Sequence, residues 1–520
     1  MHLQIKTYRL TENNSMLQTK LCNIACGKSI PLEINPESPE FFTVRNPATS
    51  ELICSFSSTP LDTVDEALKS ANAAFLSWSR STWKQRSQIL SKFRTLCLDK
   101  YRDELIGLIV RENGKHRTDA TASLLKGIET CEYALSSNIG SGSIQEVSGG
   151  VSCFDRKDPL GIIVCICPFN FPAMVPMWTL PILLVCGNCL ILKPSEKVPF
   201  TVTRMVEILH EAGLPDGVAS VIHGGKSVVN HLITHRFVAG VTFVGSSPVA
   251  ELVYNNAIKN GKRAICLGGA KNHLVLMPDA ELEQSSTDIL NSFAGSAGQR
   301  CMAASVLVLV SWDKDSEKKV NRILSRLVDK AKRIVPGQAN VGEIGPVIDQ
   351  AAVDRISNYI SESQSKYNSD LLLDGRSWIS PNSGFWIGPT ILDHSKGSAE
   401  DPALTEEIFG PVLSVVRESS LSDAIARINK SVFGNAASIY TSSGAAADLF
   451  ARSVDPGMIG VNVGVPVPRE PFSFGGTKKS KFGISDITGD GLIEFGTIRR
   501  KITTKWSTTS ADFVSRNFTG

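Results

Sequence analysis

Leu160-Gly-Ile-Ile-Val-Cys-Ile-Cys-Pro-Phe-Asn-Phe-Pro172 is the stretch that decides the fold class. It opens with a short, continuous apolar run rich in β-branched residues, and a turn bounded by prolines follows. Such a run is typical of a strand buried on both faces. Similar runs recur downstream, so strands are predicted over Gly161–Cys165, Cys189–Lys193, Ala219–Ile222, Gly240–Val244 and Ala264–Leu267.

The segments between these strands have the length and the apolar spacing of helices. The predicted helices cover Ala173–Val185, Phe200–Ala212, Ser227–His235 and Pro248–Lys259. Strands that alternate with helices predict a parallel sheet covered on both faces. The most apolar stretch, Met174–Leu192, is interrupted by prolines and a glycine, so it predicts a helix and a buried strand and no membrane span.

The residues before this sheet predict helices and strands that cover or extend it. Short strands are expected within Phe42–Phe56, and helices over Leu61–Trp78, Trp83–Arg111 and Thr118–Ala134. The polar, glycine-rich segment Ser141–Asp155 predicts a projecting hairpin. We expect a C-terminal strand near Leu492–Thr504 to pair with it, and an exposed hairpin of this kind to contact another subunit.

A second α/β series begins after residue 301. Its elements are predicted as strands over Ser305–Val310, Ile439–Thr441 and Met458–Val461, with a helix over Asp315–Lys332. The chain of 520 residues is long enough for two such units, each with its own core. Sheets of this type bind ligands at the carboxyl ends of their strands.

The composition is that of an ordinary globular protein. Hydrophobic residues make up 42% of the chain, charged residues 20%, and the formal net charge is +3. So small a charge, without a long basic run, indicates no nucleic-acid partner, and no segment indicates a membrane partner. The N-terminal segment to about Ile30 is predicted to be irregular, and it lacks the apolar core of a signal peptide.

Twelve cysteines are scattered along the chain without the rhythm of a disulfide framework, which predicts a reducing compartment. Cys165, Cys167, Cys186 and Cys189 form a C-x-C and a C-x-x-C pair, so a zinc site or a redox pair is one interpretation. All four lie in apolar runs, which favours a place in the core, and we predict no metal site.

The chemistry of the chain is predicted at Phe293-Ala-Gly-Ser-Ala-Gly-Gln-Arg-Cys301. The small residues leave room around the Cys301 thiol, and Arg300 would favour its thiolate if the guanidinium lies near the sulfur. A nucleophile and a buried structural cysteine are both compatible with this stretch alone.

Two further motifs follow predicted strands of the first sheet. Asn170 lies in a turn between two prolines, where its amide could donate a hydrogen bond to an oxyanion or could simply stabilise the turn. Lys193 and Glu196 end a strand, where they suit the ribose hydroxyls of a nucleotide. The alternative for these two residues is a solvated start of a helix.

Two weaker motifs point to the same kind of ligand. Ser246 stands where a strand passes into a helix, and a helix N-terminus there can face a pyrophosphate. Glu407 and Phe409 precede a Gly-Pro turn; Glu407 could bind a second ribose and Phe409 could pack on a nicotinamide. An acidic surface followed by a turn is the plain alternative.

The order and spacing of these motifs resemble the aldehyde dehydrogenase superfamily over about Phe42 to Trp506. The resemblance implies that Cys301 is the nucleophile and Asn170 the oxyanion donor. It implies an NAD site made by Cys167, Phe169, Lys193, Glu196, Lys197, Ser246, Glu407 and Phe409. Glu196 near the adenosine ribose would favour NAD over NADP, because a carboxylate repels a 2′-phosphate.

The fold implied by the resemblance is α/β, with two Rossmann-type parallel-sheet domains and a small β oligomerisation extension. The expected division is an NAD-binding domain at 30–140 and 156–269, a catalytic domain at 270–458, an extension at 141–155 and 485–506, and an N-terminal tail at 1–29. A homo-oligomer, either a dimer or a tetramer, is expected.

One departure from the superfamily points to a branch of it. Hydrolytic members carry a Glu that activates water, and here that neighbourhood holds Cys266 and Leu267, neither of which is a carboxylate. The stretch resembles the methylmalonate-semialdehyde dehydrogenase branch, which oxidises methylmalonate or malonate semialdehyde. In that branch the acyl group passes to coenzyme A and gives propionyl-CoA or acetyl-CoA. Hydrolysis to a free acid by another base, and a non-catalytic relative on the same scaffold, are the alternatives.

The resemblance also implies a site for the substrate carboxylate and a place in the cell. The branch is expected to hold that carboxylate with two arginines, of which Arg300 matches one and Lys126 stands at the other. A lysine keeps the charge and loses the bidentate geometry, so a shift in substrate preference is expected. The branch works in valine and pyrimidine breakdown, which predicts a mitochondrial enzyme, with a cytoplasmic one as the alternative.

Overall fold

Eight strands form a mixed sheet, the first sheet, whose five central strands run parallel. The computed structural model describes residues 20–137, 142–148, 151–338, 343–380 and 383–506. The strands lie in the order β2 (Lys28–Pro31), β1 (Cys22–Ala25), β9 (Ala219–Val221), β8 (Cys189–Lys193), β7 (Ile162–Ile166), β10 (Val238–Val244), β11 (Arg263–Leu267) and β21 (Lys481–Phe482).

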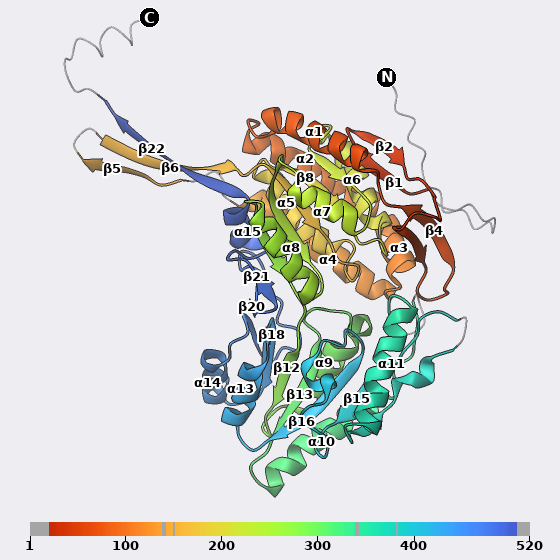
Figure 1. Ribbon diagram of the computed structural model, residues 1–520. Coiled ribbons are helices and arrows are strands. Elements are labelled where there is room, and N and C mark those ends of the chain that lie inside the picture. Colours follow the sequence, from red (N-terminus) through yellow and green to blue (C-terminus); the bar gives the residue numbers. More distant parts are fainter. Residues whose placement is uncertain (1–19, 138–141, 149–150, 339–342, 381–382, 507–520) are drawn as a thin grey trace, which may run out of the picture.

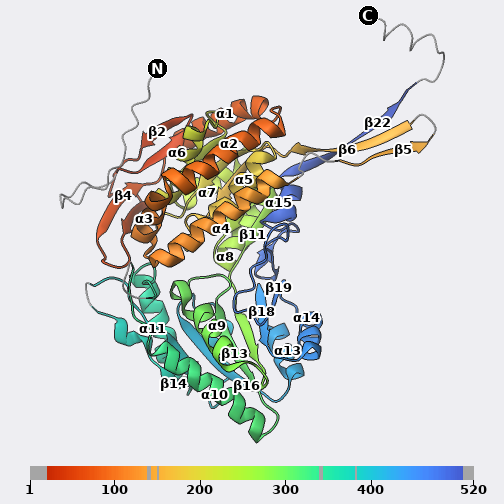
Figure 2. The same ribbon diagram turned by 180° about the vertical axis from the view of Figure 1, so that it is seen from behind.

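Helices cover both faces of the first sheet. Helices α7 and α8 lie on the side that faces the viewer in Figure 1, and α2 and α4 lie on the opposite side, which faces the viewer in Figure 2. The helices of this half are α1 (Leu61–Trp78), α2 (Trp83–Thr95), α3 (Arg102–Asn113), α4 (Arg117–Ser136), α5 (Met174–Val185), α6 (Phe200–Ala212), α7 (Lys226–Thr234) and α8 (Ser247–Lys259). A two-stranded sheet of β3 (Phe41–Arg45) and β4 (Leu52–Ser57) precedes them.

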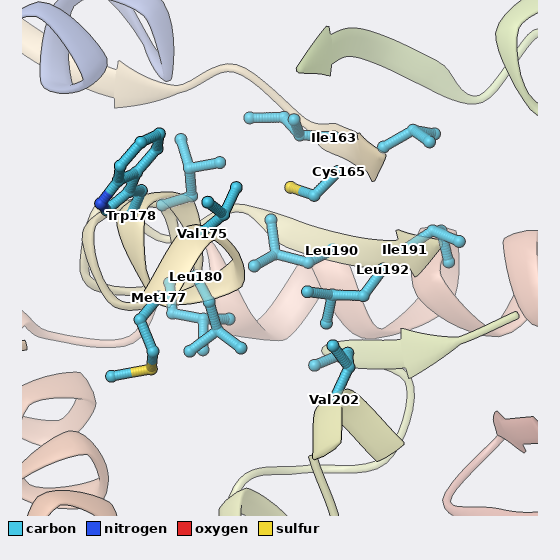
Figure 3. Close-up of a cluster of buried hydrophobic side chains, with 14 of the residues drawn as sticks. Ile163, Cys165, Val175, Met177, Trp178, Leu180, Leu190, Ile191, Leu192 and Val202 are labelled. Atoms are coloured by element: carbon cyan, nitrogen blue, oxygen red, sulfur yellow. The ribbon is translucent and has the colours of Figure 1, made fainter. Parts of the chain in front are cut away.

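Helix α5 shows why the most apolar stretch of the chain lies inside the protein. Figure 3 shows its side chains Met177, Trp178 and Leu180 as part of one buried cluster that also contains Cys165 and Leu190 of strands β7 and β8. A helix that is apolar on all sides has to be buried in a core or in a membrane. Within the described residues, no helix combines the length and the apolarity needed to cross a bilayer.

Seven strands form the second sheet, which is parallel apart from β14 at its edge. Their order is β14 (Asp370–Leu373), β15 (Thr390–Asp393), β16 (Val412–Glu418), β13 (Ala304–Val310), β12 (Asn272–Leu276), β18 (Ala436–Tyr440) and β19 (Met458–Val461). Its helices are α9 (Leu282–Ala294), α10 (Lys314–Ala331), α11 (Gln350–Ser365), α12 (Pro402–Thr405), α13 (Leu421–Lys430) and α14 (Gly444–Ser453).

A three-stranded sheet projects from the body as an arm (Figures 1 and 2). Its strands are β5 (Ile144–Ser148), β6 (Val151–Pro159) and β22 (Thr497–Lys505), in the order β22-β6-β5. The predicted hairpin and its pairing with a C-terminal strand are therefore confirmed for the described residues. The α/β fold class with two parallel-sheet units and a β extension is confirmed as well.

Three predicted elements are wrong in detail. The helix expected over Trp83–Arg111 is interrupted, because a π-helical turn at Leu96–Lys100 ends where the Tyr101 N–H bonds to the Leu96 carbonyl at 2.9 Å. Tyr101 is held there by its hydroxyl, which donates to Glu211 of α6 at 2.5 Å. A tertiary contact thus overrides a continuous helical pattern.

The other two differences lie near the termini. The segment predicted as an irregular tail contains β1 and β2, and β1 pairs antiparallel with β9 at Ile24 and Val221. The C-terminal strand begins at Thr497 rather than Leu492, because Gly489–Phe495 forms helix α15. Two short strands, β17 (Phe433–Gly434) and β20 (Thr477–Lys478), form a further antiparallel two-stranded sheet.

Candidate active site

A cavity of about 900 Å³ lies between the two sheets and is lined by residues of both. The first sheet contributes residues that follow β7, β8 and β10, and the second half contributes a loop before β13 and another before β16. Most of the predicted site residues line it, namely Cys167, Phe169, Asn170, Lys193, Glu196, Lys197, Ser246, Cys301, Glu407 and Phe409. The volume is in the range of small-molecule and cofactor sites.

The loop that carries Cys301 has an unusual backbone. Ser296, Ala297 and Gly298 all have positive φ angles, of 52°, 54° and 67°. A Cβ atom at Gly298 would lie 2.1 Å from the Gly410 carbonyl oxygen, so glycine is required at this position. Non-glycine residues in this region each cost about 1 kcal/mol or more, and surrounding contacts have to offset that cost.

Two amide side chains hold this loop in place. Asn272 donates to the carbonyl oxygens of Cys301 at 2.8 Å and Ala303 at 3.0 Å. Gln299 accepts the Ile348 N–H at 3.0 Å. Sequence reasoning gave neither residue a role, because an amide in a loop has no signature of its own. The loop is therefore held by the first residue of β12 and by the segment that precedes α11.

The environment of Cys301 differs from the one predicted. Its side chain is partly exposed, but burial and the neighbouring Glu407 raise the pKa of its thiol to about 12. Arg300 lowers that pKa, yet it is outweighed, and its guanidinium Nη2 instead donates to Asp119 at 3.2 Å. Arg300 therefore favours the thiolate, as expected, but burial and Glu407 have the larger effect and favour the thiol.

Asn170, the predicted oxyanion donor, lines the large cavity with Cys301 and contacts the Cys301 loop. It is 5% exposed, and its Nδ2 donates to the Gln299 carbonyl at 2.9 Å. That hydrogen bond uses one of two N–H groups and aims the amide at the Cys301 loop. The second N–H remains for an oxygen bound at the sulfur.

One side of the cavity is built on the ends of β8 and β10. Lys193 is 5% exposed and donates to the Gly224 carbonyl at 2.8 Å, while its Nζ lies 3.7 Å from a Glu196 oxygen. Glu196 keeps about a third of its side chain exposed, so it can accept hydrogen bonds from hydroxyl groups. Ser246 is the N-cap of α8, and its side chain makes no capping bond. The first N–H groups of α8 can therefore bind an anionic ligand.

Three predicted cofactor residues form the wall between the sheets. Lys197 pairs with Asp349 at 2.5 Å and lies over the Phe169 ring, 5.3 Å from its centroid. The Cys167 N–H bonds to the Lys193 carbonyl at 3.0 Å, so this residue shapes the wall through its backbone. The Lys197 charge is therefore already paired with a carboxylate of the chain.

Glu407 and Phe409 line the end of the cavity beside Cys301. Glu407 accepts the Ala270 N–H at 2.8 Å, and burial raises the pKa of its carboxyl to about 7. Phe409 has a positive φ of 53° and meets the Phe169 ring edge to face at 5.8 Å. A small space of about 10 Å³, lined in part by Cys301 and Glu407, adjoins them and has about the room of one water.

The two residues that replace the usual water-activating Glu are buried in β11. Cys266 is fully buried, Leu267 is 2% exposed, and burial raises the pKa of the Cys266 thiol. Gly268, directly after them, lines the cavity. These positions supply no base to the cavity.

Neither predicted carboxylate anchor lines the large cavity, although Arg300 lines the small space beside Cys301 and Glu407. Arg300 lines a separate space of about 240 Å³ together with Val463 and Val465. Lys126 pairs with Glu129 at 2.7 Å and lies 3.6 Å from Glu470. Both cations therefore already form ion pairs with carboxylates of the chain.

The cysteine pairs have no ligand role in the structure. Cys165, Cys167, Cys186 and Cys189 are free and buried. Across the described ranges, no group of three or more His, Cys, Asp or Glu side chains is placed to hold a metal ion.

Comparison with known proteins gives one consistent result. A sequence profile of the Aldehyde dehydrogenase family matches residues 34–500. Malonate-semialdehyde dehydrogenase 2 of Bacillus thuringiensis (strain Al Hakam) is 40% identical over 474 residues, which cover 90% of this chain and 95% of the relative. Malonate-semialdehyde dehydrogenase of Bacillus pumilus (strain SAFR-032) is 38% identical over 478 residues, covering 91% and 96%.

Two solved structures are similar over nearly their whole length. The methylmalonate-semialdehyde dehydrogenase of Oceanimonas doudoroffii has a TM-score of 0.89 at 36% identity, covering 95% of this chain and 100% of that one. A protein of Sinorhizobium meliloti 1021, assigned as a methylmalonate-semialdehyde dehydrogenase and complexed with NAD, has a TM-score of 0.89 at 36% identity, covering 95% and 99%.

Proposed function

This chain belongs to the aldehyde dehydrogenase family, and from that premise we propose that it oxidises malonate or methylmalonate semialdehyde with NAD and passes the acyl group to coenzyme A. The observation that carries the proposal is that Cys301 lines a cofactor-sized cavity together with Asn170 and Glu407. The names of the relatives, at 37–40% identity over most of the chain, support the semialdehyde substrate.

The residues of the cavity fit NAD. Glu196 can bind ribose hydroxyls, the N-terminus of α8 at Ser246 can bind the pyrophosphate, and Glu407 and Phe409 lie beside Cys301 where the nicotinamide end belongs. The relative solved with NAD supports the same cofactor. When bound, NAD accepts the hydride of the oxidation.

The proposed steps follow from the side chains. The Cys301 sulfur loses its proton and adds to the aldehyde carbon, and the carbonyl oxygen becomes an oxyanion that Asn170 and the Cys301 N–H stabilise. Glu407, with its pKa near 7, is placed to take the thiol proton. As the hydride leaves, the carbon–oxygen double bond reforms and Cys301 holds the acyl group as a thioester.

Coenzyme A is proposed as the acceptor because Cys266 and Leu267 leave the usual base position without a carboxylate. A thiol is more acidic than water, and a thiolate is a strong nucleophile even when it is sparse. Loss of the base therefore slows the attack of water on the thioester more than the attack of coenzyme A. The products would be acetyl-CoA or propionyl-CoA, with loss of the substrate carboxyl group as carbon dioxide or bicarbonate.

Hydrolysis is the second candidate, and one observation favours it. The small space beside Cys301 has room for about one water next to Glu407, whose carboxyl has a pKa of about 7. A carboxylate of that pKa can act as a base at neutral pH.

The test is NADH formation in matched runs with and without coenzyme A, with products identified by mass. We expect a burst of about one NADH per active site without coenzyme A, then slow turnover, and fast steady turnover to an acyl-CoA when it is added. Equal rates and a free acid as product would establish hydrolysis. In that case Glu407→Gln should abolish the steady rate.

Several wider features are proposed on the same premise. We propose the domain division 30–140 with 156–269, 270–458, and 141–155 with 485–506, and a homo-oligomer, either a dimer or a tetramer, that forms through the arm. The branch would place the reaction in valine and pyrimidine breakdown. The relatives named above are bacterial, so they give the mitochondrial prediction no support and fit the cytoplasmic alternative.

A further inference from the structure

Helix α3 ends with two polar side chains that are almost completely buried. Glu112 is 1% and Asn113 2% exposed, and buried polar groups of this kind need hydrogen-bond partners. Glu112 accepts the backbone N–H groups of Phe200 at 2.7 Å and Thr201 at 2.9 Å, at the start of α6. Glu112 therefore satisfies the first donors of another helix, whereas Asn113 bonds to the turn that contains Asn170.

The Asn113 amide holds the backbone of that turn. Its Nδ2 donates to the Phe169 carbonyl oxygen at 2.8 Å. In the part of the chain that the structure describes, no other group donates to this oxygen. The Phe169 carbonyl and the Asn170 N–H belong to one planar peptide, so the hydrogen bond fixes the orientation of that peptide and the position of the Asn170 Cα atom.

Asn170 is thus held at both ends. Its side-chain Nδ2 donates to the Gln299 carbonyl at 2.9 Å, and Gln299 belongs to the loop that leads to Cys301. The peptide that precedes its Cα atom is held by Asn113. Only two side-chain torsions lie between these fixed points, so a shift of the peptide has to turn the amide. The direction of the second Asn170 N–H therefore depends on Asn113.

The Phe169 ring offers another route by which Asn113 could influence the site. The ring meets the Phe409 ring edge to face at 5.8 Å, and both residues line the large cavity. A displaced Phe169 would then disturb the cofactor rather than the oxyanion. The two routes can be separated, because Phe169→Ala removes the ring and keeps the carbonyl that Asn113 binds.

We propose that Asn113 is a positioning residue for the oxidation step, which acts through the Phe169–Asn170 peptide to aim the Asn170 amide at the oxyanion. This inference rests on the proposed function. Asn113 lines neither of the spaces that Cys301 lines, so it acts on the reaction only through Asn170. A catalytic group misplaced by about 1 Å can lower a rate about 100-fold, which sets the scale of the expected effect.

The test is a double-mutant cycle on the rate of NADH formation in a single turnover, with malonate semialdehyde and without coenzyme A. Asn113→Ala should lower this rate about 10- to 100-fold in the wild type. In the Asn170→Ala background it should lower the rate less than about threefold, because the amide that Asn113 aims is absent. Equal factors in the two backgrounds would overturn the proposal, since a general loss of structure acts on both alike.

Two further variants separate the routes. In the Phe169→Ala background, Asn113→Ala should keep its full effect; loss of the effect there would assign Asn113 to the ring and overturn the proposal. Asn113→Asp has nearly the same shape and lacks both N–H donors, so it tests the hydrogen bond without leaving a cavity. It should lower the rate at least as much as Asn113→Ala, and a wild-type rate would contradict the role of the hydrogen bond.

Gln338→Ala is the matched control. The Gln338 amide bonds to the same end of α3, because its Nε2 donates to the Val110 carbonyl at 2.8 Å. Its loss should leave the single-turnover rate within about threefold of the wild type, and NAD affinity in Asn113→Ala should stay within about twofold. An equally slow Gln338→Ala would attribute the effect to the helix end as a whole and count against Asn113.

The outcomes for the two proposals are separate. A wild type that oxidises propanal but not malonate semialdehyde would contradict the proposed substrate, and the same cycle run with propanal would still decide the role of Asn113. A wild type that forms NADH from neither aldehyde would overturn both proposals.

Discussion

Cys301 reaches its reactive form only with help from its neighbours, because burial and Glu407 together raise the pKa of its thiol to about 12. Replacement by serine should abolish NADH formation, since a hydroxyl without a strong base is a far weaker nucleophile. Asn170→Ala should lower the rate by about two to three orders of magnitude, the usual effect of one oxyanion donor. NAD affinity, measured by fluorescence titration, should stay within about twofold in both variants. Retained turnover in the serine variant would disprove the assignment.

Lys115 should make substrate binding depend on pH. Burial lowers the pKa of its ammonium to about 7, against the opposing effect of Asp119, and Arg300 lowers it further. Below that pH Lys115 is charged and attracts a carboxylate; above it the charge is lost. We expect KM for malonate semialdehyde to rise between about pH 6 and pH 8.5, while KM for propanal, which has no carboxylate, stays flat. Parallel pH profiles for the two substrates would show that Lys115 does not act on the carboxylate.

The sequence predicted the residues of the large cavity better than it predicted their partners. Cys301, Asn170 and Glu407 line one cavity, as the order of the motifs implied. Arg300 and Lys126 were predicted to bind the substrate carboxylate, and each already forms an ion pair with a carboxylate of the chain. Asp119 is 181 residues from Arg300, and Glu470 is 340 residues from Thr130, so no local pattern could identify these pairs.

At the scale of elements, the turn before Cys301 has the strictest backbone requirement. Gly298→Ala should destabilise the protein by about 2–4 kcal/mol, because its Cβ would meet the Gly410 backbone and its φ is 67°. Urea denaturation gives the change in the free energy of unfolding. Gly444→Ala is the control, since nothing lies within 4 Å of its Cβ position, and it should stay within about 0.5 kcal/mol. Equal stability of both variants would show that the turn adapts.

Helices were predicted well where no tertiary contact overrides the periodic pattern of apolar residues. Helices α1 and α6 have the predicted bounds because their apolar stripes face a core on one side. The helix from Trp83 was predicted too long, since the contact of Tyr101 with Glu211 lies outside any sequence window. Strands β1 and β2 were missed because four-residue strands with polar ends give no alternation to detect.

At the scale of the whole molecule, the arm leaves apolar side chains without cover. Ile144 is 77% and Val147 56% exposed on β5, the edge strand of that sheet. We expect the protein to self-associate through this edge, and the double change Ile144→Lys and Val147→Lys to yield a smaller species by sedimentation velocity. Leu76→Lys on α1, where Leu76 is 62% exposed, is the control and should leave the assembly unchanged. A monomeric wild type would contradict the expectation.

The arrangement of two sheets around one cavity followed from the alternation of strands and helices, since ligand sites form where the carboxyl ends of parallel strands meet. The position of the projecting arm relative to the body could not be predicted from the sequence. Its direction depends on the register in which β22 pairs with β6, from Thr497 opposite Pro159 to Lys505 opposite Val151. The pairing itself was predicted, but its register, between segments so far apart in the sequence, leaves no trace in composition.

The segment that contains Val463 and Val465 has a consequence for the descent of related enzymes. It lines the space that Arg300 also lines, whereas the sulfur, the proposed oxyanion donor and the proposed cofactor side chains belong to other segments. Substitutions in this segment can therefore change the surroundings of Arg300 while the bond-making residues remain as they are. Random mutagenesis confined to these few positions would offer a small library for selecting new substrate ranges.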